Sequence, residues 1–237
     1  MAAKRSRLDR FIVQHSELTR RQLKPLLATG KVLVDYQPVN DANLLVDYFS
    51  HISVAGNVLQ NNQPVYFMLN KPCGTVSATK DDKNKTVFDC LRQEDSVIAG
   101  LHIVGRLDFH TTGLVLITND GRWSERLTLP NKKIEKHYRV NLQNPIDESY
   151  ISGFAEGMYF EFENITTQPA RLNIIDTHTA EVFLTEGKYH QIKRMFGRFR
   201  NPVIGLHRAA IGHIQLDPTL QPGQYRALTA DEISGIK

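Results

Sequence analysis

The segment Gly105–Asn119, GRLDFHTTGLVLITN, combines a short polar loop with a strongly apolar run. The loop brings Arg106 and Asp108 together, and the run Leu114–Ile117 follows it directly. A short run of branched apolar residues between turn formers predicts a buried β-strand. Asp108 is therefore expected at the end of a rigid element, where a reactive group can be held in place. Taken alone, a loop aspartate more often hydrogen-bonds its own turn.

The composition is that of an ordinary globular protein. The chain has 237 residues, of which 41% are hydrophobic and 23% are charged, so it can form one normal domain and a smaller one. No apolar stretch is long enough to span a membrane, and the first residues do not resemble a secretory signal. Cys73 and Cys90 lack the spacing of a disulfide framework or a zinc site. These features predict a protein of the reducing cytoplasm.

Basic residues are concentrated at the N-terminal end. Met1–Lys31 contains eight lysines and arginines but only two acidic residues, although the whole chain carries a net charge of only +4. A basic end on a nearly neutral body is typical of a module that binds phosphates. The alternative is a solvated helix face, which is what charge runs usually are.

The same region predicts two short helices, Ser6–His15 and Glu17–Ala28, because apolar residues recur there at helical spacing. Thr19 is a suitable N-cap for the second helix, and Gly30 is suited to end it. Short strands are expected at Lys31–Asp35 and His51–Val54, with a turn at Gln37–Asn40.

The polar, turn-rich segment Gln60–Pro64 marks the predicted domain boundary, giving domains 1–60 and 61–237. The second domain should alternate strands and helices. Its predicted strands are Val65–Leu69, Leu114–Ile117, His137–Leu142, Ala180–Thr185 and Leu206–Leu216. Its predicted helices run from Asn119 or Asp120 to Leu127, over Asp147–Gly157, after Gly187, and from the capping box Thr229–Glu232.

No sequence motif points to a bound cofactor. The chain lacks a P-loop, HExxH, GxSxG and GxGxxG, and its nine histidines show no ligand spacing. We therefore expect no nucleotide, metal or flavin.

A second basic segment, Lys188–Arg208, holds six lysines and arginines and no acidic residue. It would provide a further basic surface on the second domain.

The pattern Gly105-Arg106-Leu107-Asp108, then Thr111, Gly113, an apolar strand and Thr118–Gly121, resembles the motif around the catalytic aspartate of rRNA pseudouridine synthases with an N-terminal S4 domain. Three further markers fit this resemblance: Asn70-Lys71-Pro72, Lys136-x-Tyr138 and His190-Gln191-Ile192-Lys193. The N-terminal order of helices and strands is similar to the S4 RNA-binding module, except that Tyr36 stands where the module commonly has a turn glycine.

The resemblance implies an α+β fold: a small S4 module of a helix pair and short strands, then a catalytic domain on a mixed, mainly antiparallel sheet. It implies Asp108 as nucleophile, Tyr138 packed against the target base, and Lys193 or Arg194 paired with Asp108, with the His-Gln-Ile alignment favouring Lys193. Substrate contacts are expected from Arg106, Arg194, Asn70, Lys71 and His190, with Arg106 filling the gap left by a flipped base. RNA contacts of the S4 module are expected from Arg7, Arg10, Arg20, Arg21, Lys24 and Lys31.

The function implied is conversion of one uridine of 16S rRNA to pseudouridine, with base flipping and no cofactor, in the bacterial cytoplasm. The partner would be ribosomal RNA, free or in a ribonucleoprotein particle, and the protein would be a monomer. Phe67–Pro72, Leu206-His207-Arg208 and Gly223-x-Tyr225-Arg226 favour the small-subunit members. Two alternatives stay open: the same reaction on 23S rRNA, and a non-catalytic assembly factor built on the S4 module. Attack by Asp108 at C1′ or at C6, or assistance of a glycal route, would each use one carboxylate.

Overall fold

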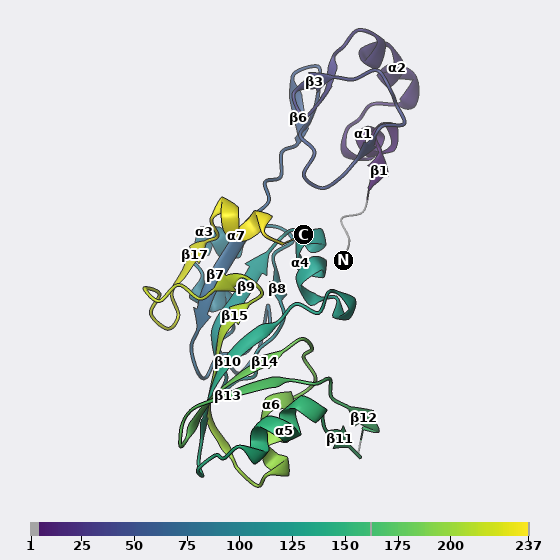
Figure 1. The fold of residues 1–237 in the computed structure, drawn as a ribbon. Coiled ribbons are helices and arrows are strands. Elements are labelled where there is room, and N and C mark those ends of the chain that lie inside the picture. The colour runs from purple at the N-terminus through teal and green to yellow at the C-terminus, as the bar shows by residue number, and fades with distance from the viewer. Residues whose placement is uncertain (1–4, 162, 237) are drawn as a thin grey trace. The chain divides into compact units, whose positions relative to one another are not determined.

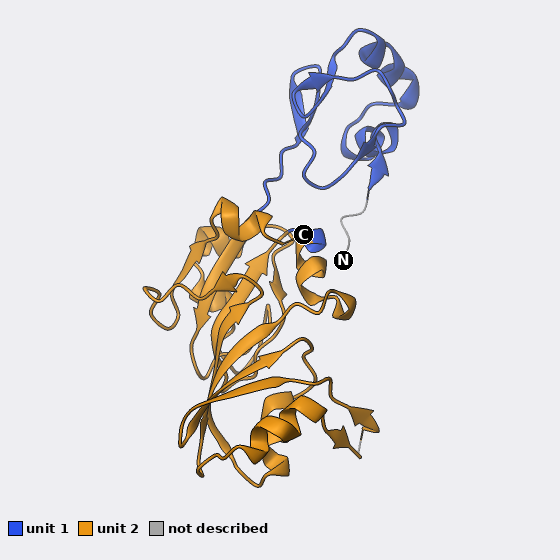
Figure 2. Ribbon diagram, viewed as in Figure 1, with its two compact units in different colours: residues 1–65, 120–122 blue, residues 66–119, 123–237 orange. Residues whose placement is uncertain are grey.

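The computed structural model describes residues 5–161 and 163–236, so that Lys4 of the basic N-terminus lies outside it. The chain divides into two compact units, residues 1–65 with 120–122, and residues 66–119 with 123–237 (Figure 2). In the part of the chain that is described, no helix is both long and apolar enough to cross a membrane.

The first unit joins a helix pair to short strands (Figure 1). Strands β3, β2, β5 and β6 form an antiparallel sheet in that order, while β1 pairs with β4. The elements are β1 (Ser6–Arg7), α1 (Leu8–His15), α2 (Arg20–Ala28), β2 (Val32–Val34), β3 (Gln37–Pro38), β4 (Leu45–Val46), β5 (Ile52–Val54) and β6 (Asn57–Gln60).

Helix α2 begins after the predicted N-cap Thr19 and ends before Gly30, although the predicted helix started earlier, at Glu17. The Thr19 side chain accepts from the Gln22 backbone N–H, and the Gln22 side chain accepts from Thr19 N, which completes a capping box. Gly30 follows the helix with a left-handed φ of 69°, which glycine adopts at little cost. Apolar residues of both helices, such as Leu8 and Leu23, pack with Val32 of the sheet in one core.

The predicted turn at 37–40 is wrong. Gln37 and Pro38 pair with β2, and the chain reverses instead at Asp35 and Tyr36, whose φ angles are 49° and 65°. Two consecutive left-handed residues form the tight turn that suits the twist of a hairpin. Tyr36 stacks on His51 with ring centroids 4.1 Å apart, a contact that helps to offset the cost of this conformation in a bulky residue.

The second unit is built on one nine-stranded sheet with order β13-β14-β10-β15-β9-β7-β17, to which β16 and β8 add by pairing with β15 and β9. Only the β15–β9 pair is parallel, which confirms the predicted mixed, mainly antiparallel sheet. Its elements are β7 (Tyr66–Lys71), a 3-10 turn (Phe88–Cys90), α3 (Gln93–Ser96), β8 (His102–Val104), β9 (Thr112–Thr118), α4 (Gly121–Thr128), a second 3-10 turn (Pro130–Lys132), β10 (Lys136–Leu142), α5 (Ser149–Glu156), β11 (Tyr159–Phe160), β12 (Ile165–Thr166), β13 (Arg171–Asp176), β14 (Thr179–Leu184), α6 (Gln191–Arg198), β15 (Val203–Ile211), β16 (Ile214–Gln215), β17 (Tyr225–Ala227) and α7 (Ala230–Ser234).

Strand β9 lies inside this sheet, between β7 and β15, and Leu114–Ile117 are fully buried. Gly113 permits the parallel pairing with β15, because a Cβ at this position would lie 2.3 Å from the Arg208 carbonyl oxygen. At the β13–β14 end of the sheet, α5 and α6 lie together (Figure 1), and Phe154 of α5 packs on Phe196 of α6. The sheet and this helix pair fix the two sides of the site described below.

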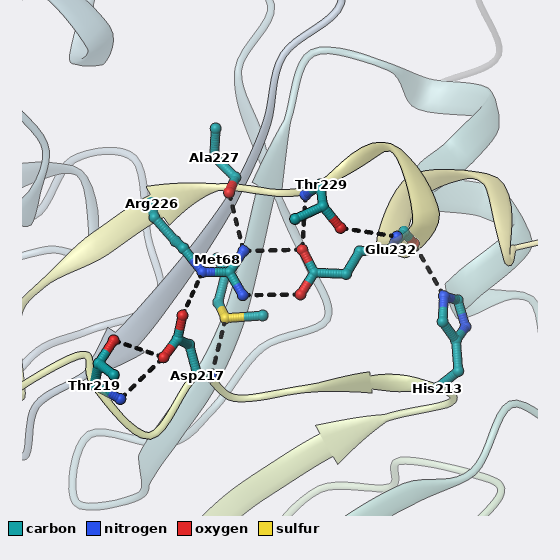
Figure 3. Close-up of polar contacts among 8 residues, drawn as sticks. All are labelled: Met68, His213, Asp217, Thr219, Arg226, Ala227, Thr229 and Glu232. Atoms are coloured by element: carbon teal, nitrogen blue, oxygen red, sulfur yellow. Dashed lines mark hydrogen bonds and ion pairs between the residues drawn. The ribbon is translucent and has the colours of Figure 1, made fainter.

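Near the C-terminus, Arg226 holds two acidic residues at once (Figure 3). Its guanidinium makes a two-pronged ion pair with Glu232 at 2.8 Å and donates from Nε to Asp217 at 2.7 Å. The Arg226 hydrogen bond is the main cause that lowers the pKa of Glu232 to about 2. Hydrogen bonds from Thr219, followed by that from Arg226, lower the pKa of Asp217 to about 2. Arg226 thereby ties β17 to α7 and to the turn after β16.

Arg226→Gln should lower thermal stability at pH 7, and this loss should shrink in acid. Carboxylates with depressed pKa values stabilise the fold fully above their unfolded pKa of about 4, and the effect disappears as the pH falls to about 2. Melting temperatures of wild type and variant across this range test the prediction. Lys80→Gln, which removes an exposed charge, should show no such convergence. A constant difference at every pH would contradict the assignment.

Candidate active site

A small open pocket of about 90 Å³ lies where the loop before β9 meets β10 and the start of α6. Three segments far apart in the sequence therefore form one site. It is lined by Arg106, Leu107, Asp108, Thr111, Tyr138, Leu184, Gly187, Lys188, His190, Gln191, Ile192, Lys193 and Leu206.

Asp108 lies in this pocket between two nitrogen groups. Its Oδ2 is 3.4 Å from His190 Nε2 and 3.8 Å from Lys193 Nζ. The Asp108 side chain is 33% exposed, so the carboxylate is open to a ligand entering the pocket. The Lys193 ammonium stabilises the negative charge by Coulomb attraction, and a protonated His190 would add to it. The arrangement offers a charged, accessible carboxylate next to the Tyr138 ring.

A buried lysine supports the loop that carries Asp108. Lys71 is 0% exposed, and its Nζ donates to the carbonyl oxygens of Thr111 at 2.8 Å, Pro72 at 3.0 Å and Phe109 at 3.3 Å. Burial lowers the pKa of Lys71 to about 8, so the group remains mostly protonated at neutral pH and keeps three donors for three acceptors. Ser77 holds the other side of the loop, donating to Leu107 O at 2.8 Å.

The wall formed by the start of α6 is fixed by Gln191. This side chain is 4% exposed, donates to Glu186 Oε1 at 2.7 Å and accepts from Lys188 N at 3.0 Å. His190 precedes α6 with a φ of 48°, a left-handed conformation that is uncommon for a histidine. Non-glycine residues in this region persist where the surroundings impose it, which is frequent at functional sites.

Helix α6 also separates the two candidate cations. Lys193 faces Asp108, whereas Arg194 pairs with Glu163 and places its guanidinium 4.0 Å from the Phe160 ring centroid. Because residues 193 and 194 point in different directions on a helix, only Lys193 reaches the carboxylate. Arg194 lies on another surface of α6, and its contact with substrate stays a prediction.

Asn70 and Lys71 are also placed differently from the prediction. Asn70 is 8% exposed and its side chain donates to Leu220 O at 2.8 Å, while Lys71 donates to the three loop carbonyls. Neither residue lines the pocket. Both side chains form hydrogen bonds inside the unit, and their contact with substrate stays a prediction. Arg106 and His190 do line it.

Several pocket residues were absent from the sequence prediction, including Thr111, Lys188 and Gln191. Leu184 and Leu206 lie in segments that the sequence predicts only as strands, and apolar strand residues carry no signal for a pocket wall. Only the strand order, which brings β14 and β15 to either side of β10, shows that these leucines flank Tyr138.

In the first unit, the six predicted RNA-contact residues are all exposed. Arg7 and Arg20 share the buried carboxylate of Asp9 at 2.8 and 3.7 Å, whereas Arg10 and Arg21 form no ion pair with an acidic side chain of the described residues. The hydrogen bond from Arg7 is the main cause that lowers the pKa of Asp9. The cationic surface that the charge distribution predicts is therefore available to a ligand.

Residues 65–197 match the family described as RNA pseudouridylate synthase. The chain is 47% identical over 231 residues to the ribosomal small subunit pseudouridine synthase A of Pseudomonas aeruginosa, covering 97% of this chain and 100% of that protein. It is 41% identical to the protein of the same name from Escherichia coli K12, covering 97% and 99% of the two chains. A crystal structure of a pseudouridylate synthase, 38% identical, matches with a TM-score of 0.71 and covers 98% of this chain and 99% of that chain.

Lys71→Met should destabilise the protein and disturb the geometry of the pocket, although Lys71 does not line the pocket. The replacement keeps most of the apolar stem but leaves three carbonyls, wholly or partly buried, without their donor, at a cost of roughly 2–4 kcal/mol. Urea unfolding measures the loss, and the NMR signals of the His190 ring report the geometry at Asp108. Lys80→Met, at an exposed site, is the matched control. Unchanged stability and an unchanged His190 signal would refute this role.

Proposed function

Because the chain belongs to the RNA pseudouridylate synthase family and is an RNA pseudouridine synthase, we propose that it isomerises a specific uridine of 16S ribosomal RNA to pseudouridine. The observation that carries this proposal is the placement of Asp108 beside Lys193 in a pocket that also holds Tyr138. These are the three residue types that the reaction needs together: a nucleophile, a cation that stabilises it, and a ring that can stack on a base.

The choice of small-subunit RNA rests on the relatives. Those at 47% and 41% identity are named as small-subunit enzymes, and the likeness extends over 97% of this chain, including the first unit. Both the pocket and the basic module are thus covered by the comparison. A 23S substrate is the competing outcome of the assay described below.

In the proposed reaction, the N1–C1′ bond breaks, the base turns within the pocket, and C5 joins C1′. The C5 proton leaves to solvent and N1 gains a proton, so that nothing else is added or removed. Asp108 acts as the nucleophile, and Lys193 balances its charge before the substrate binds. The carboxylate is 33% exposed and is therefore accessible to a nucleotide that enters the pocket.

The target uridine must leave its stack to enter so small a pocket, which costs a few kcal/mol. Stacking on Tyr138 recovers part of this cost, and the phenol hydroxyl is available for proton transfer. Arg106 is exposed at the pocket edge, on the loop that carries Asp108, and its guanidinium is well suited to occupy the space left by the flipped base. His190 would contact the same nucleotide from the α6 side.

The first unit is proposed to act as the RNA anchor. Its exposed cations (Arg7, Arg10, Arg20, Arg21, Lys24 and Lys31) would bind backbone phosphates. Such contacts give affinity and orientation, whereas the choice of nucleotide is made elsewhere.

Asp108→Asn should abolish turnover while RNA binding stays nearly unchanged, since the amide has the same shape but cannot act as a nucleophile. We expect a fall on the order of 10³-fold or more in tritium release from uridine labelled at C5. The assay uses 16S and 23S RNA in parallel, and Asp82→Asn, at an exposed loop position, is the control.

Three results of this assay are informative. Tritium release from 16S RNA alone supports the proposal. Tritium release from 23S RNA alone would identify 23S RNA as the substrate instead. Normal turnover by Asp108→Asn would refute the role of the carboxylate, and an inactive wild type that still binds RNA would favour the assembly-factor alternative.

Neutralising Arg20, Arg21 and Lys24 together with glutamine should weaken RNA binding and flatten its dependence on salt. The slope of log K against log salt should fall by about 0.7 to 0.9 for each lost phosphate contact. The matched variant replaces Lys80, Lys83 and Lys85, which are equally exposed on the second unit. Equal slopes for wild type and the first variant would show that the first unit is not the anchor.

A further inference from the structure

Two basic residues flank the pocket on the same side of the sheet as Tyr138. Lys136 is two residues before Tyr138 on β10, and its neighbour on β14 is Leu184, which lines the pocket. Arg208 on β15 is the register partner of Tyr138. Side chains at alternate positions of a strand, and at paired positions of neighbouring strands, share one face. Lys136 and Arg208 therefore lie next to the tyrosine, at the edge of the site rather than inside it.

Arg208 is a buried cation. It is 3% exposed, its Nε donates to Leu114 O at 2.8 Å, and its Nη2 is buried without a hydrogen-bond partner among the described residues. A Cβ on Gly105 would lie 3.8 Å from Nη1, which places the guanidinium directly behind the loop that carries Asp108. No carboxylate of the described chain pairs with Arg208.

Lys136 is half-buried and also lacks a partner. Within the described residues, its ammonium makes no hydrogen bond or ion pair, although the group is not sealed from solvent. Burial and, after it, the charge of Arg208 lower the pKa of Lys136. Two desolvated like charges side by side cost stability, and buried charges in proteins are normally paired.

The acidic residues nearest in the sheet are already engaged. Glu135 points to the opposite face and pairs with Arg171 at 3.4 Å, while Glu181 lies 3.1 Å from His137. Glu186 accepts from Gln191 and from the backbone of Gln168. Lys136 and Arg208 therefore lie near each other, while the carboxylates around them pair with other groups. The negative charge that would balance the two cations is left to a ligand.

We propose that Lys136 binds a phosphodiester oxygen of the RNA strand next to the extruded uridine, with Arg208 providing buried positive charge behind it. The inference rests on the proposed function, because it assumes that an RNA nucleotide occupies the pocket. A phosphate fits better than the base, since Lys136 lies at the edge of the pocket and is absent from its lining. A single ammonium is a compact point charge suited to a phosphate.

Lys136→Met tests the inference, with equilibrium binding to 16S RNA measured in an Asp108→Asn background that prevents turnover. We expect about tenfold weaker binding at low salt and a salt slope smaller by about 0.7 to 0.9. In the otherwise wild-type enzyme, KM should rise while kcat at saturating RNA is kept. Lys136→Arg should restore most of the affinity because it keeps the charge.

Thermal stability separates this role from a structural one. Removing an uncompensated, half-buried charge should leave the melting temperature of Lys136→Met unchanged or higher, whereas loss of a structural residue would lower it. Lys80→Met is the control for a change in net charge and should alter none of these quantities.

Equal affinity and equal salt slope in the parent and in Lys136→Met would overturn the inference, as would a loss confined to kcat, which would indicate a contact with the base instead. A protein that binds RNA but releases no tritium would overturn the proposed function, while the binding comparison would still decide the role of Lys136.

Discussion

The site depends on one buried ammonium group. Lys71 donates to carbonyls on both sides of the turn that follows Asp108, and it does so from a fully buried position at the end of β7. A loop exposed to solvent has many conformations, and fixing each residue costs about 1–2 kcal/mol. The lysine converts this loop into a rigid extension of the sheet. The carboxylate can then be held at a fixed distance from groups on α6, a separate element of the same unit.

Three cationic side chains, one partly exposed and two buried, surround the Asp108 carboxylate. Lys193 is the direct neighbour, Arg208 lies buried behind Gly105, and Lys71 lies beneath the loop. Charges in a poorly solvated interior act over longer distances than charges in water. The buried cations hence contribute a constant potential that salt screens only weakly, whereas the exposed cations of the first unit should respond strongly to ionic strength.

Much of the architecture could be predicted from local patterns. Apolar runs predicted β9, and alternation placed Tyr138 inward on β10. The predicted N-cap at Thr19 and the predicted capping box at Thr229 are both present. These features depend on neighbours in the sequence. The contacts of a polar side chain depend instead on residues distant in the sequence. Asn70 and Lys71 belong to the Asn70-Lys71-Pro72 motif, yet they face the interior because their partners come from residues 220 and 109–111. Lys193 and Arg194 likewise point in different directions from α6. Which of the two reaches Asp108 depends on the face of α6 that meets the loop, and the sequence does not show that face.

The order of strands in the large sheet has a consequence for synthesis on the ribosome. Strand β15, near the end of the chain, inserts between β10 and β9, and β9 and β10 touch no other common strand in the sheet order. Until residues 203–211 have emerged, the edge of β10 and the Thr112–Gly113 end of β9 would stay unpaired, and open strand edges are prone to wrong pairing. The pocket walls contributed by Tyr138 and Asp108 would also remain unconnected. The two halves of the pocket would thus be joined only late in synthesis, when β15 inserts between β10 and β9.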